Sequence, residues 1–511
     1  MTRSTNYKLC ILCAGRGTRV TLFRNLHKAF LPVGDRSALS RVVESVPNCD
    51  EIVLAVGHRG EEVAQLAKVI IKQPLRIVHV DNFDGPGSGP GYSLLQCAPY
   101  LQCPFVFTSV DTIIEEKVVD VDEDWIGVQQ IDPVNAASYC LVKGDHYLES
   151  LYFGAGDLAY IGMAGIKNYN EFWDALLHGV EKKGEHQVLD GFNRLSHVAL
   201  RRFTWHDTGN DAAYQETEKH FPSFVLPKRS ETIFFEGDRV VKYFEDAQIV
   251  ADRAARSLLL KGAVPQIHRV GEYMYYYDYS PGLLLSSVCG RKVFRSFLRS
   301  LDQKFPEVRA GPTFADDCRE MYQTKTFERI RTFEGTTLDT ISQVNGVDVE
   351  PVADVAKRIP WEDILATACP SYFHGDLQPE NIIVGAQDFV FLDWRQRFGS
   401  SLDVGDRYYD LSKLHHACIV SNEAVRRSFY RVDTDHDTAS IEIGIRSNLL
   451  VLEDELKRFC AGRYSWWKVE LLSALHYLNI ASLYKGLYRD FLFLYGKLRV
   501  TELLDVANRS V

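Results

Sequence analysis

The stretch KLCILCAGRGTRV, residues 8–20, decides the fold of the first half of the chain. An apolar run typical of a β-strand ends in Gly15 and Gly17, with Arg16 and Arg19 beside them. Glycines let backbone N–H groups turn toward an anion, and arginine holds phosphate oxygens with two donors. The spacing is not that of a Walker loop, and the third glycine of a dinucleotide-binding turn is missing. We therefore expect a phosphate-binding turn of another kind, with an ordinary strand-to-helix turn as the alternative.

Strand-like and helix-like segments alternate after this stretch. Apolar runs at residues 8–15, 51–57, 75–80 and 104–110 are separated by helix-like segments at 37–46, 60–71 and 91–101. Such alternation predicts a mostly parallel sheet covered by helices on both faces. The 511 residues suggest more than one domain, and the segment 220–230, with Pro222 and Pro227, predicts a junction. We expect domains at 1–222 and 223–511.

Composition limits the classes of function. Hydrophobic residues make up 46% and charged residues 25% of the chain, which is ordinary for a globular protein. The net charge of -10 argues against a nucleic-acid partner. The sequence shows neither a secretory signal nor an apolar stretch long enough to span a membrane, and its 11 cysteines are scattered. We expect a cytoplasmic protein without membrane insertion, in which Cys10 and Cys13 are core residues and the oligomeric state is open.

Lys28 follows the glycine turn in NLHKAFLPV, and with it the opening resembles the sugar-phosphate nucleotidylyltransferases. That family begins with a pattern close to L-A-G-G-x-G-T-R-L, followed by P-K and L-x-P-V. The matching residues are Leu12, Gly15, Gly17, Thr18, Arg19, Lys28, Leu31, Pro32 and Val33. The chain departs from the pattern at Cys13, Ala14, Val20 and His27, and none of these changes removes a charge.

Three later segments match the same family in the same order. DGPGSGPGYSLL at 84–95 resembles the loop that receives the nucleotide base, PFVFTSVDTIIEE at 104–116 contains Asp111, and FTWHDTGNDAAY at 203–214 contains Asp207. The resemblance implies that Asp111 and Asp207 hold Mg²⁺ on the phosphates. As single residues, they are also compatible with a helix cap and a turn.

The resemblance also implies roles for the remaining residues of the first half. Arg19 and Lys28 would stabilise the charge on the transferring phosphoryl group as catalytic residues. The nucleotide would be bound by Leu12, Ala14, Gly15, Arg16, Gly17, Thr18, Gly87, Ser88 and Gly89.

The second half has a different pattern. ETIFFEGDRVVKYF at 231–244 predicts a hairpin that turns at Gly237 and Asp238, followed by a helix at 245–262 and a strand near 272–280. A long and mainly helical region follows to the C-terminus. YFHGDLQPENIIV at 372–384, with VFLDW at 390–394, interrupts it. These two segments place His374, Asp376, Asn381 and Asp393 in the pattern H-G-D-x-x-x-x-N…D.

This pattern resembles the aminoglycoside phosphotransferase and choline kinase families, which share the protein-kinase-like fold. The resemblance implies that Asp376 accepts the proton of the substrate hydroxyl and that Asn381 and Asp393 hold Mg²⁺ on ATP. Lys242 would bind ATP, with Asp252 as a candidate acidic partner. No G-x-G-x-x-G loop is present, and Asp406 and Asp410 at 405–416 are expected to support the catalytic loop.

Taken together, the sequence predicts an α/β protein. A Rossmann-like nucleotidyltransferase α/β/α sheet domain would precede a bilobal protein-kinase-like domain, with lobes near 228–280 and 281–511. Two tyrosine- and tryptophan-rich segments, 272–279 and 466–467, are better explained by packing than by a cage for a quaternary ammonium ion.

The hypothesis is a bifunctional enzyme that uses ATP and a second NTP, with CTP favoured. The kinase half phosphorylates a small-molecule alcohol, and the other half couples the phosphate to a nucleotide, as in building blocks of bacterial surface polysaccharide. Two alternatives remain. The kinase half acts on an unrelated acceptor such as an aminoglycoside-like compound, or the protein is a nucleotide sensor with degenerate sites.

Overall fold

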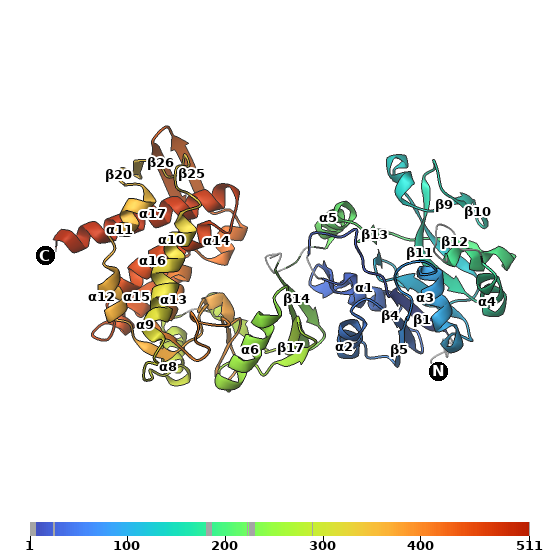
Figure 1. The fold of residues 1–511 in the computed structure, drawn as a ribbon, viewed down its shortest axis with the longest axis horizontal. Helices are drawn as coiled ribbons and strands as arrows, with labels where there is room; N and C mark the ends of the chain where they lie inside the picture. Colours follow the sequence, from blue (N-terminus) through green and yellow to red (C-terminus); the bar gives the residue numbers. More distant parts are fainter. Residues whose placement is uncertain are drawn as a thin grey trace. The chain divides into compact units, whose positions relative to one another are not determined.

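The chain divides into two compact units, each of which is described by itself. The computed structural model describes residues 7–23, 26–179, 187–221, 223, 230–288 and 290–509. The first unit comprises Met1–Ala247 and His268–Tyr277, and the second comprises Gln248–Ile267 and Asp278–Val511 (Figure 1).

A nine-stranded sheet forms the centre of the first unit. Its order is β10-β9-β11-β6-β1-β4-β5, with β8 beside β11 and β12 beside β8. The strands are β1 (Lys8–Cys13), β4 (Ile52–Val56), β5 (Leu75–His79), β6 (Phe105–Ser109), β8 (Trp125–Gln130), β9 (Leu141–Gly144), β10 (Leu148–Tyr152), β11 (Leu158–Ile166) and β12 (Ala199–Arg202).

The direction of the strands changes within this sheet. The pairs of β1 with β4 and β6, and of β4 with β5, are parallel as expected. The pairs of β11 with β6 and β8, and of β10 with β9, are antiparallel. The sheet is therefore mixed rather than mostly parallel, because β9, β10 and β11 follow one another without the helices that parallel crossovers need.

Helices cover both faces of the sheet, as expected. On one face lie α1 (Ala38–Ser45) and α2 (Gly60–Ile70), and on the other lie α3 (Pro90–Cys97) and α4 (Tyr169–Leu177) (Figure 1). Leu9 and Ile11 of β1 pack with α1 and α2, whereas Cys10 packs with α3. This alternation is the period of a strand. Cys10 and Cys13 are buried free thiols, which confirms their place in the core.

Short elements complete this part of the first unit. They are η1 (Lys28–Phe30), β2 (Pro32–Val33), β3 (Arg36–Ser37), η2 (Ala98–Tyr100), β7 (Thr112–Ile114), η3 (Pro133–Ser138), η4 (Val188–Arg194), β13 (Trp205–Asp207) and α5 (Asp211–His220). Strands β7 and β13 lie in the two predicted metal-binding segments, 104–116 and 203–214. They pair in antiparallel fashion, and this pairing places the two segments side by side.

A small antiparallel sheet also belongs to the first unit. Its order is β14 (Glu231–Glu236), β15 (Arg239–Phe244), β17 (Met274–Asp278) and β16 (His268–Val270), and the predicted hairpin at 231–244 is confirmed. Buried side chains from these strands pack in the same core as α1 and α2. The contacts therefore do not divide the chain at residue 222. The boundary at this residue stays a prediction about the domains that fold independently.

Glu236 ties this small sheet to the first unit. Its carboxylate is buried and accepts hydrogen bonds from Ser37 Oγ (3.0 Å) and Ser40 Oγ (2.6 Å) and from the Ser37 N–H (3.2 Å). Ser37 is also the N-cap of α1. A strand that follows the expected junction thus holds the start of a helix near the N-terminus.

The second unit is mainly helical, as expected. Its helices are α6 (Ala247–Leu259), α7 (Leu285–Val288), α8 (Arg291–Lys304), α9 (Phe314–Arg319), the π-helical turn η5 (Glu320–Thr324), α10 (Lys325–Ile330), α11 (Val352–Lys357), α12 (Trp361–Ala366), α13 (Arg407–Ile419), α14 (Asn422–Arg426), α15 (Ser447–Cys460), α16 (Trp466–Ala481) and α17 (Gly486–Arg509). Helix α16 packs against both α13 and α17. Helix α13 is buried along its whole length.

Three small sheets complete the second unit. They are β18 (Leu283–Leu284), β22 (Ile382–Val384) and β23 (Phe389–Phe391); β20 (Val347–Asp348), β19 (Gln343–Val344), β26 (Thr438–Ile443) and β25 (Tyr430–Asp435); and β21 (Pro370–Tyr372) with β24 (Val404–Asp406). The 3-10 turn η6 (Pro379–Asn381) precedes β22. Within the described ranges, no helix is both long enough and apolar enough to cross a membrane.

Candidate active sites

The glycine turn lies where β1 ends, next to the loops that follow β4 and β5. The carbonyl oxygen of Ala14 accepts a hydrogen bond from the His58 N–H (2.9 Å), and Arg16 Nε pairs with Asp84 Oδ2 (2.8 Å). Gly17 has a φ of 66°, and a Cβ at this position would lie 2.8 Å from Cγ of Lys28. Two features therefore require glycine at position 17: the left-handed backbone conformation and the close approach of the Lys28 side chain.

The other predicted nucleotide-binding residues surround the same edge. Leu12 is half-buried at the end of β1, and Gly15 and Thr18 are exposed in the turn. Gly87, Ser88 and Gly89 lead into α3, which packs against β1 and β4. Helix N-termini and glycine turns both present N–H groups to anions. The structure thus brings the two predicted nucleotide loops to one edge of the sheet.

Lys28 and Asp111 form an ion pair beside this turn. Lys28 Nζ lies 2.5 Å from Asp111 Oδ2, and their side chains are 13% and 17% exposed. Burial acts to raise the pKa of Asp111, but Lys28 and, more weakly, Arg19 hold it below its ordinary value. Asp111 is therefore ionised at neutral pH, and the exposed Arg19 contributes to the potential at the same place.

Asp207 lies next to Asp111 because β13 pairs with β7. Its partner in register is Thr112, the residue after Asp111. A Cβ at Gly209 would lie 2.9 Å from Asp207 Oδ1 and 3.4 Å from Asp111 Oδ2, so both carboxylates face one point. Burial, and then the charge of Asp111, raise the pKa of Asp207. Two adjacent carboxylates that repel each other favour a cation between them.

The two carboxylates fit a magnesium ion. Mg²⁺ is usually bound by one or two carboxylates together with waters and substrate phosphates, rather than by a full set of protein ligands. Among the described residues, no group of three or more His, Cys, Asp and Glu side chains could hold a metal by itself. Asp111 and Asp207 thus match a metal that binds together with a nucleotide.

Tyr139 is a further residue of this site that the sequence did not indicate. Its hydroxyl donates to Asp207 Oδ2 (3.1 Å), and its ring packs edge-on against Trp205. Burial, followed by Asp207, raises the pKa of Tyr139 to about 12, so the phenol stays protonated as a donor. Tyr139 follows η3 in a segment without a recognisable motif, and only the fold brings it to Asp207.

In the second unit, the H-G-D loop is held by buried hydrogen bonds. His374 is fully buried and its Nε2 lies 2.7 Å from the carbonyl oxygen of Leu392. Burial lowers the pKa of His374 to about 4, so the ring is neutral. Asp410 accepts hydrogen bonds from the N–H groups of His374 (2.7 Å) and Gly375 (2.6 Å). Helix α13 therefore fixes the loop through Asp410.

Asp376 lies in a network that includes a lysine outside the motif. Its Oδ1 accepts a hydrogen bond from Gln378 Nε2 (3.0 Å) and lies 3.2 Å from Lys413 Nζ. Asn381 Nδ2 donates to the Asp376 carbonyl oxygen (2.9 Å), which leaves the amide oxygen of Asn381 as the atom able to bind a metal. Lys413 lies three residues after Asp410, and this spacing on a helix is the signal that could have revealed it.

Asp393 follows β23 with an unusual backbone conformation. Its φ is 58°, a left-handed value that non-glycine residues rarely adopt. Such strain is concentrated at functional sites. His374 and Asn381 are both linked to the residue before Asp393, because the Leu392 N–H donates to the Asn381 carbonyl oxygen (2.7 Å) and the Leu392 carbonyl contacts His374. The structure thus brings Asp376, Asn381 and Asp393 into one network.

Lys242 lies centrally in β15, as expected, but this strand belongs to the first unit and not to the second. It is buried and its Nζ lies 3.4 Å from Glu231 Oε1 on the neighbouring strand. Asp252, the acidic partner suggested from the sequence, belongs to the second unit and binds both Arg397 Nε (2.5 Å) and Arg397 Nη2 (2.9 Å). Glu231 is thus a partner that sequence reasoning missed, although it stands near Lys242 in the hairpin.

The tyrosine-rich strand β17 packs into the first unit. Tyr275 and Tyr277 are buried, whereas Tyr273 and Tyr276 lie under the guanidinium groups of Arg59 and Arg239. These contacts agree with the interpretation of this segment as core.

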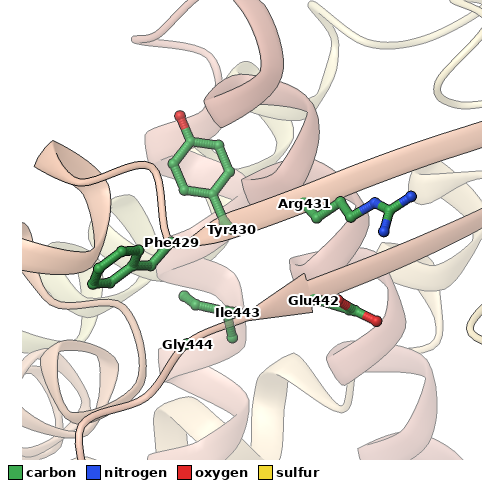
Figure 2. Close-up of a pocket in the computed structure, with 6 residues that line it drawn as sticks. All are labelled: Phe429, Tyr430, Arg431, Glu442, Ile443 and Gly444. Atoms are coloured by element: carbon green, nitrogen blue, oxygen red, sulfur yellow. The ribbon is translucent and has the colours of Figure 1, made fainter.

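A shallow hollow of about 350 Å³ lies on the β25–β26 hairpin of the second unit. Figure 2 shows its lining, which consists of Phe429, Tyr430, Arg431, Glu442, Ile443 and Gly444. None of the predicted site residues borders it, so it gives no support to either predicted reaction.

Comparison with known proteins identifies part of the first unit. Residues 9–120 match the MobA-like NTP transferase domain. No curated protein matches the chain. A solved UDP-glucose pyrophosphorylase complexed with UDP-glucose is 16% identical and matches 42% of this chain and 98% of its own, with a TM-score of 0.36.

Two further solved structures match the chain to a similar degree. An inositol-1-phosphate CTP transferase from T. maritima is 15% identical, covers 42% of this chain and 96% of its own, and has a TM-score of 0.35. A CTP:phosphocholine cytidylyltransferase from Streptococcus pneumoniae is 17% identical, covers 42% and 99%, and also has a TM-score of 0.35. The residues that match the MobA-like NTP transferase domain, 9–120, include the glycine turn, Lys28 and Asp111, whereas Asp207 lies outside them.

Proposed function

We propose that the first unit transfers a nucleotidyl group from an NTP to a phosphorylated small molecule. The observation that carries this proposal is the cluster of Lys28, Asp111 and Asp207. Lys28 and Asp111 lie in the residues that match the MobA-like NTP transferase domain, and the pairing of β13 with β7 brings Asp207 to them. A Mg²⁺ ion held by Asp111 and Asp207 would neutralise charge on the phosphates. Lys28 and Arg19 would stabilise the charge that builds up on the transferring group.

The reaction needs no general base in this site, because a phosphate monoester is already an ionised nucleophile. An oxygen of the phosphorylated acceptor attacks the α-phosphorus of the NTP and forms the new O–P bond. The bond from the α-phosphorus to the bridging oxygen breaks, and pyrophosphate leaves. Binding groups at the glycine turn and at Gly87–Gly89 hold the NTP in line for this attack.

We also propose that the second part of the chain phosphorylates the acceptor with ATP. Asp376 would take the proton of the acceptor hydroxyl. The hydroxyl oxygen would bond to the γ-phosphorus of ATP, the bond from that phosphorus to the bridging oxygen would break, and ADP would leave. Asn381 and Asp393 would hold Mg²⁺, as the resemblance of the H-G-D segment implies. Support comes from the hydrogen-bonded H-G-D loop and from the strained backbone of Asp393.

The product of the two reactions would be a nucleoside diphosphate compound, NDP-X. CTP is the favoured second nucleotide because activated phospho-polyols are usually CDP compounds. A role in bacterial surface polysaccharide or its decoration follows from the resemblance alone and is part of the proposal.

The test separates the two reactions in one purified protein. Pyrophosphate release is measured with each NTP and a panel of phosphorylated alcohols, and ADP release is measured with ATP and the parent alcohols. Pyrophosphate release that depends on Mg²⁺, Lys28 and one NTP supports the proposal. Tight binding of NTP and ATP without release of either product would favour a nucleotide sensor instead.

A further inference from the structure

Beside Asp376, the second unit gathers positive charge that the proposed phosphorylation does not explain. We call Lys325, Arg395 and Lys413 the cationic cluster. Lys413 Nζ lies 3.2 Å from Asp376 Oδ1, and Arg395 Nη1 donates to the hydroxyl of Tyr409 (3.4 Å). Tyr409 lies one turn before Lys413 on the same face of α13.

Lys325 joins the cluster from another helix. Its charge acts on Tyr409, and the charges of Arg395 and Lys413 act on Lys325 in turn. Within the part of the chain that the structure describes, the one ion pair made by the cluster is that of Lys413 with Asp376. The cluster therefore brings a surplus of positive charge to a largely buried place.

The neighbouring groups do not cancel this surplus. The rings of His416 and His476 are buried and stay neutral, since burial and the charge of Lys413 lower their pKa values, that of His416 to about 3. Although burial opposes it, the three cations lower the pKa of Tyr409 to about 8, which reports a positive potential at its hydroxyl. Buried like charges are costly unless an opposite charge joins them.

The backbone that positions Lys325 is also unusual. The π-helical turn η5 ends at Thr324, directly before Lys325. Such turns are rare and occur frequently at functional sites. Tyr322 within η5 is fixed, because its hydroxyl donates to the buried Asp406 Oδ2 (2.8 Å). The turn therefore sets the direction of the backbone where α10 begins with Lys325.

We propose that the cationic cluster binds an anionic group, a phosphate or a carboxylate, on the alcohol that is phosphorylated. This inference rests on the proposed kinase function of Asp376. The acceptor hydroxyl must reach Asp376, and Lys413 contacts that same carboxylate, so a charged group on the same small molecule lies within reach of the cluster. The acceptor class is thus a phosphorylated alcohol or sugar, or a hydroxy acid, and not an amino alcohol.

The test compares acceptors that differ in one charged group. ADP release is measured with glycerol and glycerol 3-phosphate, glucose and glucose 6-phosphate, glycerate, and ethanolamine. We expect turnover of an anionic member and little of its neutral parent. Preference for ethanolamine or for a neutral alcohol would overturn the inference.

Variants of Lys325 locate the effect. Lys325→Gln is expected to raise KM for the anionic acceptor about ten- to a hundredfold, as loss of a charge-assisted contact would, with KM for ATP unchanged. Lys325→Arg keeps the charge and should retain most of the affinity. Lys357→Gln, at a lysine with an exposed side chain on α11, is the matched control. A rise in KM for ATP alone would mean that the cluster binds the ATP phosphates, which contradicts the inference.

A second readout does not depend on turnover. Acetylation of Lys325 by an amine-reactive reagent is followed by peptide mass spectrometry with and without glycerol 3-phosphate, inorganic phosphate or ethanolamine. Protection by the two anions alone supports the anion site even if no acceptor is phosphorylated, a result that would remove the kinase proposal only. Equal labelling with and without the anions would overturn the inference.

Discussion

The two candidate sites are assembled in opposite ways. The transferase site takes Lys28, Asp111 and Asp207 from three distant segments, and the sheet edge brings them together. The H-G-D site takes Asp376, Asn381 and Asp393 from one short stretch, which α13 holds in place through Asp410. The first site therefore depends on the fold of the unit, whereas the second depends on a loop and one supporting helix.

The balance of charge also differs between the two sites. Two adjacent carboxylates face Lys28 in the transferase site, and this arrangement favours an added cation. Beside Asp376 the cationic cluster outnumbers the carboxylate, and that arrangement favours an added anion. Both sites would bind phosphates in the two proposed reactions. The transferase site favours an added cation, however, whereas the site at Asp376 favours an added anion.

The largest effect is expected from Asp376→Asn. Loss of a general base reduces rates about a hundred- to ten-thousandfold. ATP-dependent phosphorylation should fall by that amount, while nucleotidyl transfer from a supplied phosphorylated acceptor stays as in the unaltered protein. ADP and pyrophosphate release are measured in parallel, with Asp433→Asn, at an exposed carboxylate, as control. Loss of both activities would show that the two sites are not independent.

Asp111→Ala tests the other site in the opposite direction. Pyrophosphate release should fall about a thousandfold, the upper end of what loss of one electrostatic contact costs. ADP release should not change. Asp120→Ala, at a carboxylate with a 48% exposed side chain that pairs with Arg201, is the matched control. Pyrophosphate release that survives in Asp111→Ala would mean that the metal is held elsewhere.

Glu236→Ala tests whether the small sheet supports the transferase unit. The change removes the acceptor of the buried Ser40 hydroxyl and of the Ser37 N–H, which costs about 1–3 kcal/mol for each unpaired group, while the Ser37 hydroxyl can still donate to Ser40 Oγ. Thermal unfolding should begin at a lower temperature, and nucleotidyl transfer should be lost at the same temperature. Glu61→Ala, at a highly exposed side chain, serves as control. An unchanged unfolding temperature would show that the small sheet is not needed by the transferase fold.

The smallest effect is expected from Tyr139→Phe. The Tyr139 hydroxyl favours the ionised form of Asp207, so its removal should raise the already elevated pKa of Asp207 further. Because the pKa of Asp207 is raised in the folded protein, protonation of Asp207 increases the free energy of unfolding at low pH. This contribution to stability is lost as the pH rises through the raised pKa. Mg²⁺ needs the ionised form, so Mg²⁺ binding strengthens over the same range.

The measurement for Tyr139→Phe is Mg²⁺-dependent pyrophosphate release from about pH 4 to about pH 8. The acid limb of the profile should move to higher pH, while the rate at the plateau changes little. Tyr147→Phe, at an exposed tyrosine of the same unit, should leave the profile unchanged. A lower plateau with an unmoved acid limb would assign Tyr139 a role other than support of Asp207.

Local patterns made much of the fold predictable from the sequence. The alternation of segments indicated the parallel strands and their helices, and the glycine turn indicated the phosphate edge. The antiparallel strands could not be predicted, because short segments such as β9 and β10 have no period that fixes their direction. The packing of β14–β17 in the first unit was also hidden, since buried side chains such as Phe234 do not reveal their partners.

The site residues show the same limit. Lys28, Asp111, Asp376 and Asn381 stand in motifs whose spacing is visible in the chain. Tyr139 does not, because it reaches Asp207 only through the fold. The cationic cluster lies on different elements of the second unit, and no spacing joins Lys325 to the others.

One labelling experiment tests most directly whether a single chain performs both reactions. The protein is incubated with ATP that carries ¹⁸O on its γ-phosphate, with each NTP, and with the acceptor panel, and NDP-X is identified by mass. We expect the phosphate attached to X to carry the label, and we expect Asp376→Asn or Asp111→Ala to abolish the labelled product. NDP-X without the label, or labelled product from Asp376→Asn, would refute the coupling of the two reactions in this chain.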